Sequence, residues 1–201
     1  GGEVELFNKL ASSLISGKVT ADGATLARIR KQYMAHVKHI APSASFITDK
    51  LPHNFLYINL IKLIFPESKI VHVKRSPGAV CWSNFTQYFP GSSHGYSCDL
   101  SNVIKYHEIY SELMDFWYGK YKEQIFSIDY DVLVTKPDAK SRELIAFIGL
   151  DWQSACLHPE LNDRVVQTAS SHQVRQPIFA RSSEKWKRFL PYLGGKFDHF
   201  L

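Results

Sequence analysis

The stretch KIVHVKRSPGAVCWSNF, residues 69–85, reads as a strand, a turn and a helix. Its first part is a continuous run of apolar and β-branched residues, which is typical of a strand buried on both faces. Ser76 suits a helix cap and Pro77 suits the first helical position. Arg75 stands between strand and helix, and Ser83 follows it by eight residues. The stretch therefore predicts one strand–turn–helix unit with a cation at its turn.

Helix-like and strand-like patterns alternate along the rest of the chain. Alternation of this kind predicts an α/β fold in which helices flank a mostly parallel sheet. The segment 54–65 is apolar nearly all round, which predicts a buried helix. Helices are predicted over residues 5–15, 25–40, 54–65, 99–121 and 140–148 and from about residue 182 onward, and further strands over 45–50 and 124–134.

Size and composition favour one globular domain that covers residues 1–201. The net charge of +5 favours anionic partners. The three cysteines lack the spacing of a zinc site or a disulfide framework, and no histidine pair has metal-ligand spacing. No apolar run reaches the roughly 18 residues that span a bilayer, and no signal peptide is recognisable.

Three cationic or aromatic side chains lie at predicted strand ends, where ligands bind in parallel sheets. Arg75 with Ser83 can bind a phosphate, because the guanidinium fork takes two oxygens and the hydroxyl a third. The alternative is an arginine paired with a carboxylate and a serine bonded to its own helix. Lys50 either reaches the same anion or is a solvated strand end, and Tyr130 either stacks on a base or fills a core edge.

The loop TASSHQVRQPIF, residues 168–179, is rich in hydroxyl, amide and guanidinium groups and long for an idle connection. Loops of this composition commonly surround a ligand with N–H groups and hydroxyls. Together with the strand-end residues, the loop predicts a nucleotide-like ligand with at least two anionic ends.

The segments TDKLPHNF, IVHVKRSPGAVCWSNF, DYDVLV and TASSHQVRQPIFARSSEKWKRF resemble the sulfotransferases that use 3′-phosphoadenosine 5′-phosphosulfate (PAPS). The chain is most similar to the bacterial sulfotransferases linked to tetratricopeptide repeats, with tyrosylprotein sulfotransferases as relatives. The resemblance covers nearly the whole chain. It implies a P-loop nucleotide hydrolase-like sulfotransferase fold, PAPS as co-substrate and no metal.

The resemblance also implies roles for residues that match the family's motifs. Arg75 and Ser83 match the pair that binds the 3′-phosphate, and Tyr130 matches a tyrosine near the nucleotide. Lys50 and Ser170 match residues that stabilise charge in the transition state of the tyrosylprotein branch.

Further matches lie towards the two ends of the chain. Glu3 is similar to the glutamate that takes the proton from the acceptor hydroxyl, and Glu5 is the alternative if the register is two residues off. The segment 170–177 is similar to the loop that closes over PAPS, and Lys185 to the lysine that follows it. The nucleotide contacts that this loop implies are Ser170, Ser171, Gln173, Val174 and Arg175.

The chain departs from the family pattern in two places. It contains no P-x-S-G-T-S or P-x-S-G-T-T loop for the 5′-phosphosulfate. We therefore expect an N-terminally truncated fragment that lacks the first strand and this loop, or else a degenerate relative. Gln87 stands where the tyrosylprotein branch carries an additional basic residue, so a different acceptor specificity is expected.

These observations predict a PAPS-dependent sulfotransferase that acts on a hydroxyl of a sugar, a small metabolite or tyrosine. An inactive module that binds PAPS or its product, adenosine 3′,5′-bisphosphate (PAP), is the alternative. A nucleic-acid-binding protein is disfavoured because the basic residues are spread singly, and a P-loop kinase because GxxxxGKS and GxxxxGKT are missing. A homodimer and, for a bacterial protein, a cytoplasmic location are compatible with the sequence.

Overall fold

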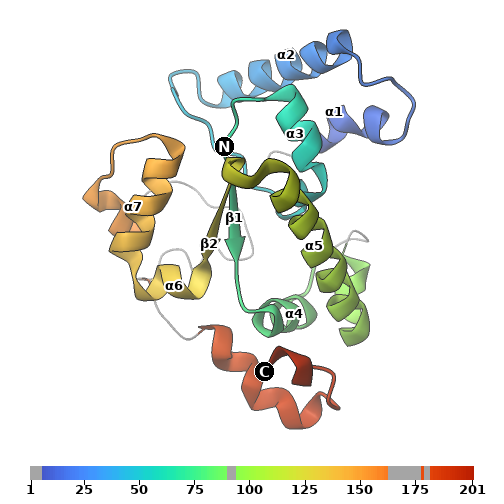
Figure 1. The fold of residues 1–201 in the computed structure, drawn as a ribbon, viewed down its shortest axis with the longest axis vertical. Helices are drawn as coiled ribbons and strands as arrows, with labels where there is room; N and C mark the ends of the chain where they lie inside the picture. Colours follow the sequence, from blue (N-terminus) through green and yellow to red (C-terminus); the bar gives the residue numbers. More distant parts are fainter. Residues whose placement is uncertain (1–5, 90–93, 163–177, 179–181) are drawn as a thin grey trace. The chain divides into compact units, whose positions relative to one another are not determined.

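The computed structural model describes residues 6–89, 94–162, 178 and 182–201. The chain divides into two compact units, Gly1–Ser68 and Lys69–Leu201, which we call the N-terminal and C-terminal units. The described part of the N-terminal unit is helical, whereas the C-terminal unit holds a small parallel sheet with helices (Figure 1). The predicted α/β class is thus observed, with more helix than strand.

Three α-helices and a 3-10 turn build the described part of the N-terminal unit: α1 (Leu6–Ile15), α2 (Gly23–Ile40), η1 (Pro52–Tyr57) and α3 (Ile58–Ile64). The first two helices confirm the helices predicted over residues 5–15 and 25–40. Asp22 caps α2 by accepting a hydrogen bond from the Thr25 amide at 2.8 Å. The helices share one apolar core, made by Phe7, Ala11, Ile29, Tyr33, Val37, Ile64 and Phe65.

Two predictions for this unit are wrong. The predicted strand over residues 45–50 is irregular, and only Asp49 has a bridge-type pairing. The predicted buried helix over residues 54–65 is divided between η1 and α3, and Leu56 and Leu63 are 42% and 50% exposed. Lys62 is buried instead, because its ammonium group donates hydrogen bonds to the carbonyls of Pro66 (2.6 Å) and Ser68 (2.8 Å).

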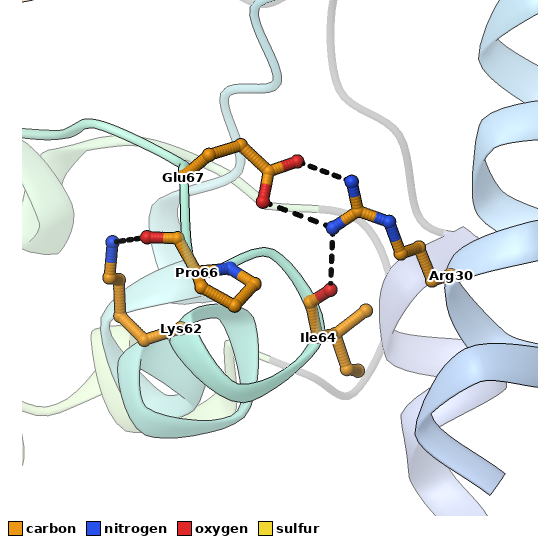
Figure 2. Close-up of polar contacts among 5 residues, drawn as sticks. All are labelled: Arg30, Lys62, Ile64, Pro66 and Glu67. Atoms are coloured by element: carbon orange, nitrogen blue, oxygen red, sulfur yellow. Dashed lines mark hydrogen bonds and ion pairs between the residues drawn. The ribbon is translucent and has the colours of Figure 1, made fainter. Parts of the chain in front are cut away.

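Arg30 secures the end of α3 from α2, as Figure 2 shows. Its guanidinium donates to the Ile64 carbonyl at 2.9 Å and to both carboxylate oxygens of Glu67, at 3.0 and 2.5 Å. The hydrogen bond from Arg30 lowers the pKa of the Glu67 carboxyl. Cations near the end of a helix satisfy carbonyls that have no partner within the helix. Arg30 and Lys62 together therefore fix the backbone at the C-terminal end of α3.

A pair of parallel strands organises the C-terminal unit: β1 (Ile70–Lys74) and β2 (Ile125–Asp129), in register from Ile70↔Ile125 to Lys74↔Asp129 (Figure 1). The α-helices of this unit are α4 (Pro77–Thr86), α5 (Leu100–Tyr121), α6 (Tyr130–Thr135) and α7 (Pro137–Ile148). The described 3-10 helices of this unit are η2 (Gly95–Cys98), η3 (Lys122–Gln124), η4 (Ser154–Leu157), η5 (Pro159–Leu161), η7 (Ser182–Tyr192) and η8 (Asp198–Phe200).

The helices predicted over residues 99–121 and 140–148 are confirmed, with Asp99 as the cap of α5 and Gly149 closing α7 in the left-handed conformation at φ 80°. Pro77 begins α4 as predicted, although the Ser76 side chain makes no capping hydrogen bond. The strand predicted over residues 124–134 stops early. Asp129 accepts hydrogen bonds from the amides of the two residues after Tyr130, at 2.8 and 3.0 Å, and thereby starts α6.

The prediction that β1 is buried on both faces is wrong for the described chain. Val71 and Val73, which share one face of the strand, are 39% and 55% exposed. In the described sheet β1 has a hydrogen-bonded neighbour on one side only. A strand at the edge of a two-stranded sheet cannot bury its side chains as a central strand does.

The core of the C-terminal unit joins α4 and α5 to the end of the chain. Its buried members are Ala79, Cys81, Val103, Trp186, Leu193 and Phe197. Trp186 is 1% exposed and lies against the backbone of Gly78, the second residue of α4. A Cβ atom at Gly78 would come within 2.5 Å of Trp186 Cζ2. Only glycine allows η7 to approach α4 this closely.

We predict that Gly78→Ala lowers the free energy of unfolding by about 1–3 kcal/mol, because the added methyl must displace a buried indole. Urea denaturation measures the change. Gly119→Ala is the matched control, since Gly119 lies in α5 with open space at its Cβ position. That variant should gain about 0.5–1 kcal/mol from helix propensity. Equal stability of the two variants would contradict the close contact.

Candidate functional site

Arg75 and Tyr130 meet at the carboxyl edge of the sheet. Each directly follows its strand, and the strands end in register at Lys74↔Asp129. The Arg75 guanidinium lies 5.2 Å from the centroid of the Tyr130 ring, within the range of a cation–π interaction. The parallel pairing therefore brings together two of the side chains that the sequence placed at strand ends.

Two serine hydroxyls from η7 complete this cluster. Arg75 Nε donates to Ser183 Oγ at 2.8 Å, and Arg75 Nη2 donates to Ser182 Oγ at 3.1 Å. Ser182 Oγ lies 3.4 Å from the Tyr130 hydroxyl. We call these four residues the Arg75 cluster. Ser183 is buried, whereas Arg75, Tyr130 and Ser182 are half-buried.

All side-chain partners of Arg75 in the described chain are uncharged. Its hydrogen bonds go to hydroxyls and its ring contact to tyrosine. Within the described ranges no carboxylate lies within ion-pair distance of this guanidinium. In the described chain Arg75 therefore does not form the structural ion pair that was the alternative to a phosphate site. Because these partners are neutral, the positive charge of the half-buried guanidinium is not neutralised by them and can attract an anion.

The other predicted site residues are placed as follows. Ser83 is exposed on α4 and makes no hydrogen bond to Arg75 in the described structure; its carbonyl accepts from the Gln87 amide at 3.1 Å. Lys185 is exposed on η7, directly before Trp186.

The remaining predictions fall in the N-terminal unit or on segments left undescribed. Lys50 belongs to the N-terminal unit and is exposed. Its neighbour Asp49 accepts a 2.7 Å hydrogen bond from the buried Tyr33, which ties the segment to α2. Seven predicted residues lie outside the described residues: Glu3, its alternative Glu5, Ser170, Ser171, Gln173, Val174 and Arg175.

A neutral network supports β1 directly before Arg75. The His72 ring nitrogens form hydrogen bonds with the hydroxyls of Tyr118 and Tyr110 on α5. Burial, and to a smaller extent the positive charge of Lys74, lowers the pKa of His72 to about 4. Burial also raises the pKa of Tyr110 to about 12. All three side chains are therefore uncharged near pH 7, and the network fixes β1 to α5 without a net charge.

Sequence reasoning missed Ser182, Ser183, Gly78 and His72. The sequence pattern places Ser182 only at the start of the last predicted helix and assigns no role to Gly78. The one available signal was that two adjacent hydroxyls precede Lys185 and Trp186 in RSSEKW. Their partner is more than a hundred residues away, which no local pattern reveals.

The described segments hold no cluster of metal ligands and no helix of membrane-spanning length and hydrophobicity. Three or more histidine, cysteine, aspartate or glutamate side chains do not converge there in a way that could hold a metal ion. None of the helices described is both long and apolar enough to cross a membrane.

Comparison with known proteins identifies the family. A model described as the sulfotransferase family matches residues 17–154, more than half of the 201 residues. A protein of Aquifex aeolicus without an assigned function is 35% identical over 174 residues, which cover 86% of this chain and 23% of that protein. A Caenorhabditis briggsae protein, provisionally named a protein-tyrosine sulfotransferase, is 23% identical over 148 residues, covering 70% of this chain and 51% of its own. The chain thus spans about a quarter of the length of the Aquifex aeolicus protein and about half of the length of the Caenorhabditis briggsae protein.

We predict a pH dependence of stability that originates at His72. Because the folded-state pKa is lowered, the unfolded chain takes up a proton below about pH 6.5 while folded His72 stays neutral down to about pH 4. The free energy of unfolding should therefore fall as pH decreases through this window. His72→Gln should flatten the fall, measured by urea denaturation between pH 7 and 4.

His36→Gln is the control, because it removes an exposed histidine of α2 from the other unit. Parallel pH profiles for the wild type and His72→Gln would contradict the assignment.

Proposed function

The chain belongs to the sulfotransferase family, and we propose that it binds PAPS and transfers its sulfuryl group to a hydroxyl acceptor. The observation that carries the proposal is the Arg75 cluster. A cation at the carboxyl end of a parallel strand, held by neutral groups, suits the 3′-phosphate that distinguishes PAPS from common nucleotides.

The proposed anion site uses the strand–turn–helix of β1 and α4. Arg75 supplies the charge, and Tyr130 supplies an aromatic face from the adjacent strand. Ser83 and Lys185, both exposed, are proposed as further ligands of the nucleotide, together with the loop residues from Ser170 to Arg175. We also propose that β1 and β2 belong to a P-loop nucleotide hydrolase-like sheet, in which nucleotides bind at this same edge.

The proposed reaction is an in-line displacement at sulfur. The acceptor oxygen forms a new S–O bond while the bond between sulfur and the 5′-phosphate oxygen breaks, and PAP leaves with that electron pair. The acceptor proton passes to a carboxylate, for which Glu3 is the proposed base. Catalysis of such transfers rests mainly on positioning and on stabilising developing charge.

Lys50 is the proposed stabiliser of charge on the departing oxygen, together with Ser170. A lysine ammonium suits this task, because its positive charge stabilises the negative charge that develops on the departing oxygen. The hydrogen bond from Tyr33 to Asp49 fixes the backbone from which Lys50 extends.

The proposed acceptor is a hydroxyl of a sugar, a small metabolite or tyrosine. The name of the Caenorhabditis briggsae relative supports tyrosine as one candidate. Gln87, the residue that caps the C-terminus of α4, stands where the tyrosylprotein branch carries a basic residue and therefore favours an acceptor of different charge. Assaying transfer from PAPS to a tyrosine peptide, a glycan and a small phenol tests this directly.

We predict that Arg75→Ala weakens PAP binding by at least about thirtyfold, because truncating one partner of a charged hydrogen-bonded pair costs about 2 kcal/mol or more. Isothermal titration calorimetry measures the affinity. Arg28→Ala, at an exposed position of α2, changes the net charge equally and should leave the affinity unchanged. Equal affinities of Arg75→Ala and wild type would remove Arg75 from the nucleotide site.

Lys50→Ala should lower kcat by about a hundredfold or more and change PAP affinity little, since its proposed contact forms only as charge develops. A sulfate-transfer assay and a PAP titration separate the two effects. Lys18→Ala serves as the control for loss of an exposed lysine in the same unit. A loss confined to affinity would contradict the role in transfer, and PAP binding without turnover in the wild type would favour the inactive module.

A further inference from the structure

We infer that Ser182 and Ser183 are positioning residues for Arg75, which set the guanidinium so that one defined edge faces the anion. The inference rests on the proposed function, because it concerns how the same 3′-phosphate site is prepared. Neither serine lies within the segment matched by the family model, which ends at residue 154.

An inventory of the guanidinium donors supports this orientation. Arginine has five N–H groups in a fixed plane. The side formed by Nε and Nη2 is used by Ser183 at 2.8 Å and by Ser182 at 3.1 Å. In the described structure this leaves both N–H groups of Nη1 and the second of Nη2. The second N–H of Nη2 and the adjacent N–H of Nη1 form the end of the guanidinium, which can bind two oxygens of one phosphate.

The choice of hydroxyl groups as partners matters for affinity. A carboxylate would hold the guanidinium equally well but would cancel its charge. A serine hydroxyl accepts the hydrogen bond and leaves the positive charge available. Ser182 also reaches the Tyr130 hydroxyl at 3.4 Å, while the Tyr130 ring lies 5.2 Å from the guanidinium carbon. Arg75 is thus held at one edge and beside an aromatic ring.

The two serines are themselves fixed by the contact between Gly78 and Trp186. Gly78 follows Arg75 by three residues, and Trp186 follows Ser183 by three residues. The indole is 1% exposed and touches the Gly78 backbone, so the start of η7 cannot move away from the start of α4 without opening the core. Ser183, itself 3% exposed, is therefore presented to Arg75 by a rigid support.

Prior ordering of Arg75 should strengthen binding, because immobilising a long side chain costs free energy when a ligand binds. Without the two hydroxyls the arginine keeps its charge but samples several rotamers. We therefore expect a loss of roughly tenfold in affinity for a ligand that carries the 3′-phosphate. A ligand without this phosphate should be unaffected, since it makes no contact with Arg75.

The experiment compares PAP with adenosine 5′-monophosphate by calorimetry, in wild type, Ser182→Ala, Ser183→Ala and the double variant. We expect PAP affinity to fall roughly tenfold in the double variant and monophosphate affinity to stay constant. Ser182→Thr, which keeps the hydroxyl, should restore PAP binding. The matched control is Ser141→Ala, which removes another buried serine hydroxyl. Ser141 lies on α7, and its hydroxyl accepts a hydrogen bond from Trp152 Nε1 at 2.9 Å.

A double-mutant cycle distinguishes positioning from direct contact. In an Arg75→Ala background, removal of both serine hydroxyls should have no further effect on PAP affinity, because there is no guanidinium to orient. An undiminished tenfold effect in that background would overturn the inference. If Ser183→Ala impairs folding, Ser182→Ala still tests the proposal, since Ser182 is only half-buried.

The outcomes separate the inference from the proposed function. Wild-type protein that binds both ligands equally would refute the 3′-phosphate site and the inference with it. Preference for PAP that survives in the double variant would overturn the inference alone. Equal losses for both ligands would show that the serines only support the fold, which also overturns it.

Discussion

The contact between the Gly78 backbone and the Trp186 indole is the constraint on which the Arg75 cluster depends. The parallel strands alone bring Arg75 beside Tyr130, because both follow strands that end in register. The hydroxyls of Ser182 and Ser183 come from more than a hundred residues further along the chain. They reach the guanidinium because α4 begins with a residue that has no side chain, which lets a buried aromatic ring lie on the helix backbone. The same contact between Gly78 and Trp186 thus packs the core and sets the geometry of the site.

Two arginines in this chain show how partner chemistry separates a structural role from a binding role. Arg30 donates to both oxygens of Glu67 and to the Ile64 carbonyl, so its charge is neutralised where it holds the end of α3. Arg75 donates to hydroxyls only in the described structure and is half-buried. A half-buried cation without an anion carries a desolvation cost, and a charge of this kind in a protein is a candidate for ligand binding. The comparison within one chain supports the anion site more strongly than the position of Arg75 alone.

The long helices and the end of β1 before Arg75 were predictable from sequence because their signals are local. Apolar spacing predicted α1, α2 and α5, and Gly149 marked the end of α7. The failures came from side chains that bond to the backbone or across the fold. Asp129 starts a helix where β-branched residues suggested that a strand continues. Lys62 is buried against carbonyls where an apolar face was expected. At the site, a serine can be recognised as a helix start, but its bond to an arginine 108 residues earlier cannot.

The division of the chain into two units assigns the steps of the proposed reaction to different parts of the molecule. The family match runs from residue 17 to residue 154, so it includes parts of both units. The proposed nucleotide contacts of Arg75 and Tyr130 lie in the C-terminal unit, which has its own core around Trp186. Lys50, proposed to act on the departing oxygen, extends from the N-terminal unit, which has a separate core around Tyr33. On these proposals, residues of the C-terminal unit bind the 3′-phosphate, and a residue of the N-terminal unit acts in transfer. In a protein of the proposed kind, turnover can be lost while affinity for the nucleotide is kept, so the two quantities report on different units.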